Sequence, residues 1–235
     1  RPLNRKYDAV IFDLFGTLID DISTPGPQMD RYRRVVSKMA FALDVPVEGF
    51  ERLWNETLDK RMAGGFADLE ANFRAICREL GGSPDASQVA EAVQVRIEFI
   101  RSAMTPRPDT NATLTRLRGA GYRIGLISDC GPGTAAVWDE TSFAPLIDEA
   151  VLSCSVGLKK PDPRIYTLAC QRLGVSPERC LYVGDGGSSE LTGATAMGMR
   201  AVLIRAPYDD QVGGYREEWP GQRVSSLSEV PPLLE

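Results

Sequence analysis

The pattern of apolar and polar positions first predicts a strand that ends in a carboxylate. Residues 9–12 are all apolar, Asp13 follows them, and the chain then turns through Phe15-Gly16-Thr17. A short apolar run bounded by polar residues is typical of a buried strand. Parallel α/β sheets bind ligands just beyond the carboxyl ends of their strands, so we expect Asp13 to be functional rather than structural.

The next part of the chain has a helical period. Leu, Val, Ala, Phe and Ile recur at helical spacing in four segments, residues 29–43, 50–62, 69–80 and 86–104. Breaks containing Gly, Pro or Ser separate the segments, and one of them, Gly64-Gly65, is either a flexible turn facing Asp13 or the end of a helix. The pattern predicts an insert of about four helices without strands.

From residue 106 onward, strand and helix patterns alternate. Strands are predicted at residues 122–128, 149–153, 180–183 and 201–204, and helices at 110–120, 134–139, 162–173 and 189–197. Such alternation is typical of right-handed βαβ units in a parallel sheet. The predicted fold class is therefore α/β, a Rossmann-like parallel sheet with helices on both faces plus an α-helical cap subdomain.

The same pattern predicts how the chain is divided. We expect residues 1–20 and 104–235 to form the α/β core and residues 21–103 to form the helical cap. A cap inserted after the first strand would lie over the edge where Asp13 emerges, where it can exclude water and select substrate. The tail after Pro207 is rich in Gly, Pro and acidic residues, and Leu227, Leu233 and Leu234 are its expected anchors.

Charge and composition narrow the class of partner. Net charge is −5, from 27 basic and 32 acidic residues, and no Lys/Arg block is dense enough to indicate nucleic acid. Arg31, Arg33, Arg34 and Lys38 are typical of the solvent-facing side of a helix. No apolar segment approaches the ~20 residues that a membrane span needs, and the first residues show no signal-peptide pattern. We expect a cytoplasmic protein that binds neither nucleic acid nor membrane, and the sequence leaves monomer and homodimer open.

The counts of cysteine and histidine restrict the chemistry. The five cysteines form no C-x-x-C pair, which favours reduced thiols packed as small apolar residues. The chain contains no histidine at all. This excludes Ser-His-Asp and Cys-His nucleophile systems and zinc bound by histidine. Any proton transfer near neutral pH must therefore use a carboxylate, lysine, tyrosine, cysteine or water, and we expect the chemistry to be that of carboxylates.

Polar side chains are expected at four strand ends of the predicted sheet. They are Asp13 and Thr17, Ser128 and Asp129, Lys160 in Gly157-Leu158-Lys159-Lys160-Pro161-Asp162, and Asp185 with Glu190 in Gly184-Asp185-Gly186-Gly187-Ser188-Ser189-Glu190. Each alone is typical of a turn, a helix cap or a solvated corner. Together and in this order, with a helical insert after the first strand, they resemble the haloacid dehalogenase-like (HAD) hydrolase superfamily. The resemblance covers residues 7–204.

The resemblance implies an active site for a small anionic substrate. Asp13 would be the nucleophile that forms a covalent aspartyl intermediate, which water then cleaves. Ser128 would hydrogen-bond to an oxygen of the transferred group. Lys160, chosen over Lys159 because the family pairs this lysine with proline, would stabilise negative charge in the transition state.

Three further residues are candidates to bind the substrate: Thr17, Asp129 and Arg61. Thr17 and Asp129 accompany the family motifs at the strand ends. Arg61 lies in the helical insert, where it would hold a carboxylate through two parallel hydrogen bonds. The alternative for Arg61 is a solvated arginine at the end of a helix.

The resemblance also implies a bound Mg²⁺ ion. Asp13, Asp185 and the backbone carbonyl of Phe15 would hold it, since Mg²⁺ prefers oxygen ligands. Glu190 stands where the family often has a second aspartate. Its carboxylate would bind the ion directly, bind it through water, or orient Lys160.

Phe15 departs from the phosphatases of this superfamily. They generally carry an aspartate two residues after the nucleophile, which protonates the leaving group, a contribution typically worth about 10²–10⁴-fold. An aromatic residue there resembles the haloacid dehalogenase branch, whose leaving halide needs no proton. That branch replaces the acidic metal motif, however, and this chain retains Asp185 and Glu190.

Three hypotheses about function follow. The leading one is a Mg²⁺-dependent phosphohydrolase, in which an activated leaving group, the substrate itself, or a carboxylate such as Asp20, Asp21 or Asp129 replaces the missing acid. The second is a metal-independent 2-haloacid dehalogenase. The third is a binding or regulatory protein that has kept the fold and lost efficient catalysis.

Overall fold

A six-stranded parallel sheet forms the centre of the molecule. The computed structural model describes residues 5–20, 27–209 and 216–234. The strands lie in the order β3-β2-β1-β4-β5-β6, all parallel, which confirms the α/β class. Their bounds are β1 Ala9–Phe12, β2 Arg123–Ser128, β3 Glu149–Leu152, β4 Cys180–Gly184, β5 Arg200–Ile204 and β6 Arg223–Val224. The two-residue edge strand β6 has too few apolar positions to be seen in the sequence pattern.

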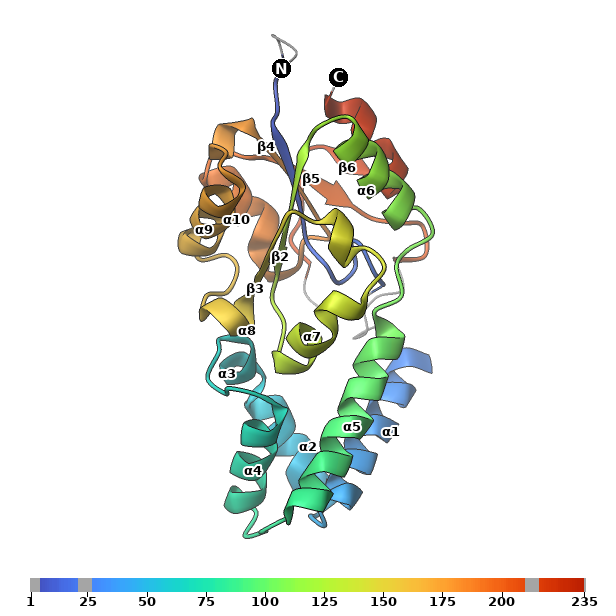
Figure 1. Cartoon of the computed structure of the whole chain (residues 1–235), viewed down its shortest axis with the longest axis vertical. Helices are drawn as coiled ribbons and strands as arrows, with labels where there is room; N and C mark the ends of the chain where they lie inside the picture. Colours follow the sequence, from blue (N-terminus) through green and yellow to red (C-terminus); the bar gives the residue numbers. More distant parts are fainter. Residues whose placement is uncertain (1–4, 21–26, 210–215, 235) are drawn as a thin grey trace.

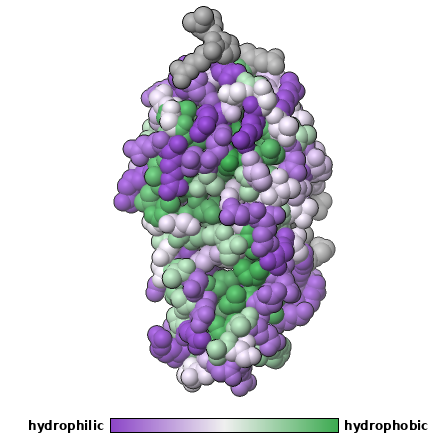
Figure 2. All heavy atoms as spheres, in the orientation of Figure 1, coloured by the Kyte–Doolittle hydropathy of each residue, from purple (hydrophilic) through white to green (hydrophobic). Residues whose placement is uncertain are grey.

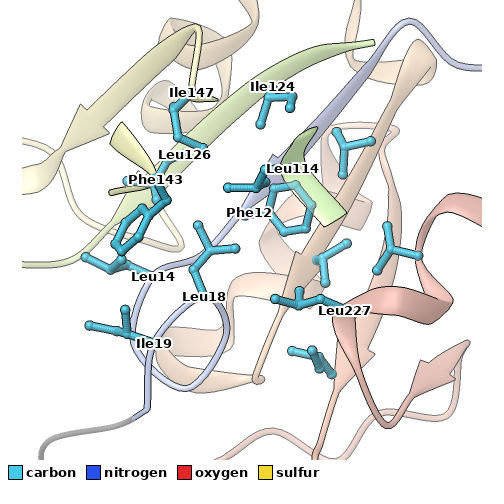
Figure 3. Packing of buried hydrophobic residues seen from close by; sticks show 14 of the residues in the cluster. Phe12, Leu14, Leu18, Ile19, Leu114, Ile124, Leu126, Phe143, Ile147 and Leu227 are labelled. Atoms are coloured by element: carbon cyan, nitrogen blue, oxygen red, sulfur yellow. The ribbon is translucent and has the colours of Figure 1, made fainter. Parts of the chain in front are cut away.

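Both faces of the sheet are buried, as the continuous apolar runs indicate. Successive side chains of β1 point to opposite faces. Ala9 and Ile11 join a hydrophobic cluster with the helices on one face, whereas Val10 and Phe12 join a second cluster on the other. Figure 3 shows Phe12 in that second cluster, close to Leu114 and Leu227.

Helices of the core cover both faces of the sheet. Helices α9 and α10 lie on one side of the sheet in Figure 1, and α6 lies on the other. The core helices are α6 Thr110–Gly119, α7 Pro132–Val137, α8 Ser153–Val156, α9 Pro163–Leu173 and α10 Glu190–Ala196. The expected anchors of the tail are confirmed, because Leu227 and Leu234 are buried and Leu233 packs against the same cluster. No helix in the described ranges is long and apolar enough to cross a membrane.

The helices between β1 and α6 form a group that we call the five-helix unit. It comprises α1 Pro27–Ala42, α2 Val47–Glu56, α3 Leu58–Met62, α4 Leu69–Glu79 and α5 Ala86–Ala103. The unit has a hydrophobic cluster of its own, in which the rings of Phe50, Trp54 and Phe73 have centroids between 5.6 and 6.0 Å apart. In Figure 1 it lies beyond the carboxyl ends of the strands.

The prediction of four helices in this part of the chain was wrong by one. Residues 50–62 do not form a single helix, because α2 ends at Glu56 and α3 begins at Leu58. Between them, the Thr57 hydroxyl donates to the carbonyls of Leu53 and Trp54 at 2.8 and 3.2 Å. Such bonds from a threonine side chain to the preceding turn bend or interrupt helices.

Gly64 ends α3 rather than facing Asp13. Its φ of +76° is in the left-handed region that favours glycine. A Cβ at this position would lie 2.9 Å from the carbonyl oxygen of Cys154 in the core. The backbone of the five-helix unit therefore approaches the core closely at this turn, which a larger residue would prevent.

Candidate active site

The strand register brings three of the expected site residues to one edge of the sheet. Phe12 of β1 is paired with Leu126 of β2 and with Val183 of β4. The residues that follow these positions include Asp13, Ser128 and Asp185. Asp13 continues the ladder, since its backbone N–H donates to the carbonyl of Val183 at 2.9 Å. Parallel pairing is therefore the reason why residues more than 100 positions apart in the sequence meet here.

Lys160 lies between two carboxylates. Its Nζ is 2.6 Å from Asp13 Oδ1 and 2.6 Å from Glu190 Oε2. Burial alone would lower the pKa of Lys160, but Asp13, Glu190 and Asp129 together raise it well above its ordinary value. Lys160 is therefore a fixed positive charge beside Asp13. Lys159 points elsewhere, with its Nζ 2.5 Å from Asp59 in the five-helix unit.

Glu190 is fully buried, and its carboxylate accepts three hydrogen bonds. Its Oε2 accepts from Lys160 and from the hydroxyl of Tyr182 at 2.8 Å, and its Oε1 accepts from the backbone N–H of Gly186 at 3.0 Å. Burial and the nearby Asp13 raise the pKa of Glu190, and Lys160 opposes that shift. Gly184 makes room for this carboxylate, since a Cβ there would lie 2.2 Å from Glu190 Oε1.

Asp185 lies as close to Gly16, in the turn after β1, as Glu190 lies to Gly184. A Cβ on Gly16 would lie 2.2 Å from Asp185 Oδ2, and Gly16 has a φ of +76°. Asp185 accepts hydrogen bonds from the Gly187 N–H at 2.9 Å and from Arg216 Nε at 2.8 Å. Burial and the charge of Asp13 raise the pKa of Asp185 to about 6, although Arg216 acts in the opposite direction.

The three buried carboxylates fit a metal site unequally. Asp13, Asp185 and Glu190 each offer an oxygen within 4.8 Å of the others. Asp185 lies against the turn at Gly16, and Asp13 lies within reach of it, so these two carboxylates fit the role of Mg²⁺ ligands. Glu190 already accepts from three donors, one of them a cation, so its contacts fit the role of orienting Lys160 better than that of a direct ligand.

Two polar atoms beside Asp13 are buried and have no hydrogen-bond partner in the described chain. They are Ser128 Oγ and Asp129 Oδ2. Buried polar atoms are normally satisfied, and Asp129 lines the pocket that contains Asp13, so its orphan oxygen points to a ligand. Asp129 Oδ1 does have a partner, the backbone N–H of Lys160 at 3.0 Å. Thr17, by contrast, is fully buried and donates to Asp13 Oδ2 at 3.2 Å, so it contacts the nucleophile.

A small pocket of about 110 Å³ holds most of these groups. It is lined by Asp13, Phe15, Asp129, Lys160, Asp185, Gly187, Ser188, Glu190 and Arg216. Phe15 and Asp129 also line a larger cavity of about 320 Å³ that extends toward the five-helix unit. The apolar wall that Phe15 provides is thus shared by the two spaces.

Arg61 lines the larger cavity and is not the solvated arginine that the alternative reading expected. Only 4% of Arg61 is exposed. Its guanidinium stacks on Trp54 at 3.6 Å from the ring centroid, and its aliphatic part packs over Gly131 of the core. The sequence pattern missed this burial because it predicted one helix over residues 50–62, whereas α2 ends at Glu56 and α3 begins at Leu58.

Other residues around the site carried no usable sequence signal. Arg216 reaches Asp185 from the Gly-rich tail, Tyr182 reaches Glu190 from the middle of β4, and Arg96 enters the cavity from α5. Of the carboxylates that could replace the missing acid, Asp20 pairs with Arg107 and is largely exposed. Asp21 lies outside the described residues.

Comparison with known proteins agrees with this geometry. A family model described as haloacid dehalogenase-like hydrolase matches residues 7–198. The chain belongs to the haloacid dehalogenase-like hydrolases. Membership makes it a hydrolase and disfavours the hypothesis of a purely binding or regulatory protein.

Relatives of this haloacid dehalogenase-like hydrolase include proteins named as phosphatases and proteins named as dehalogenases. A glyceraldehyde 3-phosphate phosphatase of Methanopyrus kandleri is 33% identical over 201 residues, 84% of this chain and 83% of the relative. The (S)-2-haloacid dehalogenase H-109 of Pseudomonas putida is 27% identical, over 98% of this chain and 99% of the relative. The crystal structure of a HAD phosphatase from Thermococcus onnurineus has a TM-score of 0.68 and 25% identity, covering 97% of each chain.

Proposed function

We propose that this hydrolase is a Mg²⁺-dependent phosphohydrolase that acts on a small phosphorylated metabolite through an aspartyl phosphate on Asp13. The observation that carries the proposal is the buried set of Asp13, Asp185 and Glu190 around Lys160. A dehalogenation without metal has no need of the carboxylate of Asp185 at this place. The phosphatase names among the relatives agree with this choice.

The residues of the site suit the two steps of such a reaction. An oxygen of Asp13 attacks phosphorus, the bond from phosphorus to the leaving oxygen breaks, and water later cleaves the aspartyl phosphate to release phosphate. Lys160 stabilises the negative charge that gathers on the phosphoryl oxygens, and the hydroxyl of Ser128, at the end of β2, would donate to one of them. Thr17 holds the nucleophile in place through Asp13 Oδ2.

Mg²⁺ would be held by Asp13, Asp185 and the backbone carbonyl of Phe15. When bound, it supplies additional positive charge to the transferred group. Gly16 is what allows the turn after β1 to come this close to Asp185.

Asp129 is the residue best placed to supply the proton that Phe15 cannot. It lines the same pocket as Asp13, and its Oδ2 is buried and unpartnered. The Asp129→Asn variant should lose roughly 10²-fold or more in kcat for alkyl phosphates, whose leaving group needs a proton. It should lose much less for p-nitrophenyl phosphate, whose leaving group departs as an anion. Equal losses for the two substrates would exclude Asp129 as the acid.

Phosphate release measured with and without Mg²⁺ tests the main proposal. A panel of small phosphomonoesters, including glyceraldehyde 3-phosphate, should be hydrolysed with Mg²⁺, and EDTA should reduce turnover sharply. The Asp13→Asn variant should be inactive because the amide cannot act as the nucleophile. Turnover that survives EDTA would contradict the metal requirement, and turnover that survives Asp13→Asn would contradict the covalent route.

We further propose that residues 21–103 act as a cap on a core formed by residues 1–20 and 104–235. The separate hydrophobic cluster of the five-helix unit supports this division. Addition of Mg²⁺ and orthovanadate should then slow hydrogen exchange of amides where α5 meets α7. Unchanged exchange at that contact would speak against closure of a cap over the site.

A second candidate, metal-independent dehalogenation of a 2-haloacid, is favoured by one observation. Phe15 presents an apolar ring to the reaction pocket, and relatives named as (S)-2-haloacid dehalogenases match the chain over nearly its full length. Chloride released from 2-chloropropionate in EDTA, and lost in Asp13→Asn, would select this candidate. If no haloacid in a panel releases halide while phosphomonoesters release phosphate, this candidate is eliminated.

A further inference from the structure

The larger cavity beside the active site contains two arginines that face mostly apolar walls. It has a volume of about 320 Å³ and adjoins the catalytic pocket through Phe15 and Asp129. Much of its lining is apolar, namely Leu58, Met62, Leu69 and Ile100. Figure 2 shows apolar surface gathered across the middle of this face of the molecule.

Arg61 is held in the cavity wall by three acceptors of its own unit. Its Nη1 donates to the carbonyl of Trp54 at 3.1 Å, to the hydroxyl of Thr57 at 3.1 Å and to Oδ1 of Asn72 at 3.0 Å. These acceptors are all neutral. They fix the plane of the guanidinium and leave Nε and Nη2 without a hydrogen bond to any described residue.

Arg96 has fewer partners still. Its Nε and Nη1 are buried and have no hydrogen-bond partner among the residues that the structure describes. Its guanidinium is surrounded by the rings of Tyr32, Trp54 and Phe99, with centroids between 5.3 and 5.8 Å away. Aromatic faces stabilise a cation in part, but they accept no strong hydrogen bond from the N–H groups.

No carboxylate in the described chain compensates these two charges. Burial and the charge of Arg96 lower the pKa of Arg61 to about 10, and burial likewise lowers the pKa of Arg96. Burying a charge without a counter-charge is costly. The free-energy cost of leaving a buried charged donor without an acceptor also exceeds the net free energy that its hydrogen bond would contribute. Among the described residues nothing neutralises this pair of like charges, so the cavity favours an anion as its occupant.

We propose that Arg61 and Arg96 form a binding subsite for a second anionic group of the substrate, a carboxylate or a phosphate, at the end remote from the transferred phosphoryl group. The substrate class is then a phosphomonoester whose short organic part carries an additional acid. The apolar wall would contact its carbon chain, and the free N–H groups of the two guanidiniums match the oxygens of such an acid. This inference rests on the proposed phosphohydrolase function.

Three matched substrates test the subsite. They are 4-(phosphonooxy)butanoate, butane-1,4-diol bisphosphate and, as the neutral control, 4-hydroxybutyl phosphate. Wild type should prefer the two acids over the neutral ester by roughly 10- to 100-fold in kcat/KM, mainly through KM, because the contact is equal in ground and transition states. The preferred acid identifies the group as carboxylate or phosphate.

Arginine variants locate the preference. Arg96→Met and Arg61→Met should each reduce the acid-to-neutral ratio of kcat/KM at least tenfold, and Arg96→Lys should restore part of it. The control is Arg34→Met, which removes an exposed arginine of the same unit and should leave the ratio unchanged. A wild-type ratio near one, or a ratio that the Arg96 and Arg61 variants leave intact, would overturn the proposal.

A binding measurement separates this inference from the proposed function. Trp54 contacts both guanidiniums, so its fluorescence can report titration of Asp13→Asn with 4-(phosphonooxy)butanoate. If no ester is hydrolysed but binding weakens at least tenfold in the Arg96→Met background, the subsite stands and the phosphohydrolase proposal is false. If esters are hydrolysed but binding is indifferent to Arg96 and to the second acid, the subsite is false and the phosphohydrolase proposal stands.

Discussion

Replacing Glu190 with glutamine tests whether this side chain orients Lys160 or binds the metal. The substitution preserves shape and removes one charge from a fully buried group. The carboxylate now accepts from Lys160, Tyr182 and Gly186. A glutamine has one oxygen and one NH₂ group, so in either orientation its NH₂ faces at least one donor that loses its acceptor.

The contacts give the expected size of the effect. A hydrogen bond to a charged group contributes about 1.5–3 kcal/mol against about 0.5–1.5 kcal/mol for a neutral one, and a buried orphan donor costs about 1–3 kcal/mol. Relief of the repulsion between positions 190 and 13 offsets part of this loss. We expect Glu190→Gln to reduce the free energy of unfolding by about 2 kcal/mol. For a chain of this size that corresponds to a decrease in Tm of roughly 4–8 °C.

Thermal unfolding without metal and Mg²⁺ titration calorimetry measure the two roles separately. The matched control is Glu140→Gln, which removes an exposed ion pair with Arg101 and should leave Tm nearly unchanged, because solvent screens such pairs. Asp185→Asn should lose at least tenfold more Mg²⁺ affinity than Glu190→Gln. A Glu190→Gln variant with an unchanged Tm and no measurable Mg²⁺ binding would refute the orienting role and make Glu190 a direct ligand.

Three shorter predictions concern the turn after β1 and the thiols. In a phosphate-release assay, Phe15→Asp should raise kcat for alkyl phosphates at least tenfold in the Asp129→Asn background, because it restores a proton donor there, and should change kcat much less where Asp129 is present; an unchanged kcat in the Asp129→Asn background would mean that position 15 cannot fill that role. Gly16→Ala should weaken Mg²⁺ binding at least tenfold by calorimetry, since its Cβ would meet Asp185 Oδ2 at 2.2 Å; unaltered affinity would remove Asp185 from the metal site. The hydrogen bond with Cys130 lowers the pKa of Cys154 to about 7, against the opposing effect of burial. The rate of alkylation of Cys154 by iodoacetamide should therefore rise through pH 7 as the thiolate forms, and Cys130→Ala should move the midpoint of that rise to higher pH. A midpoint near pH 9 in both proteins would disprove the coupling.

The fold and the reacting centre could be predicted because their signals are local. The apolar run before Asp13 identifies β1, and parallel pairing then brings every following strand end to the same edge. The choice of Lys160 over Lys159 followed from the proline after it, and the two side chains do point to different partners. Such features depend on chain direction and spacing, which the sequence contains.

The contacts that decide roles could not be predicted, because they depend on which elements pack together. A helical period places Arg96 on a helix but does not reveal that Tyr32, Trp54 and Phe99 surround it. The burial of Arg61 could not be predicted either, because the apolar pattern indicated one helix over residues 50–62 and concealed the new helix that begins at Leu58. Arg216 comes from a tail whose composition resembles an ordinary surface segment.

Phe15 connects the two inferences about this enzyme. An aspartate at this position would donate a proton in the catalytic pocket only. The phenyl ring of Phe15 instead forms part of the wall of that pocket and of the larger cavity that contains Arg61 and Arg96. An ionised aspartate at this wall would also attract the two guanidiniums and compete with an anionic substrate for them. Loss of the acid at position 15 therefore removes a competing charge from a cavity that contains two arginines. The orphan carboxylate oxygen of Asp129, at the junction of the two spaces, is the group that can compensate for the lost proton donor. The apolar residue at position 15 therefore keeps the two arginines available to an anionic group of the substrate. Phe15→Asp should weaken the binding of acid-bearing esters even where it speeds their hydrolysis.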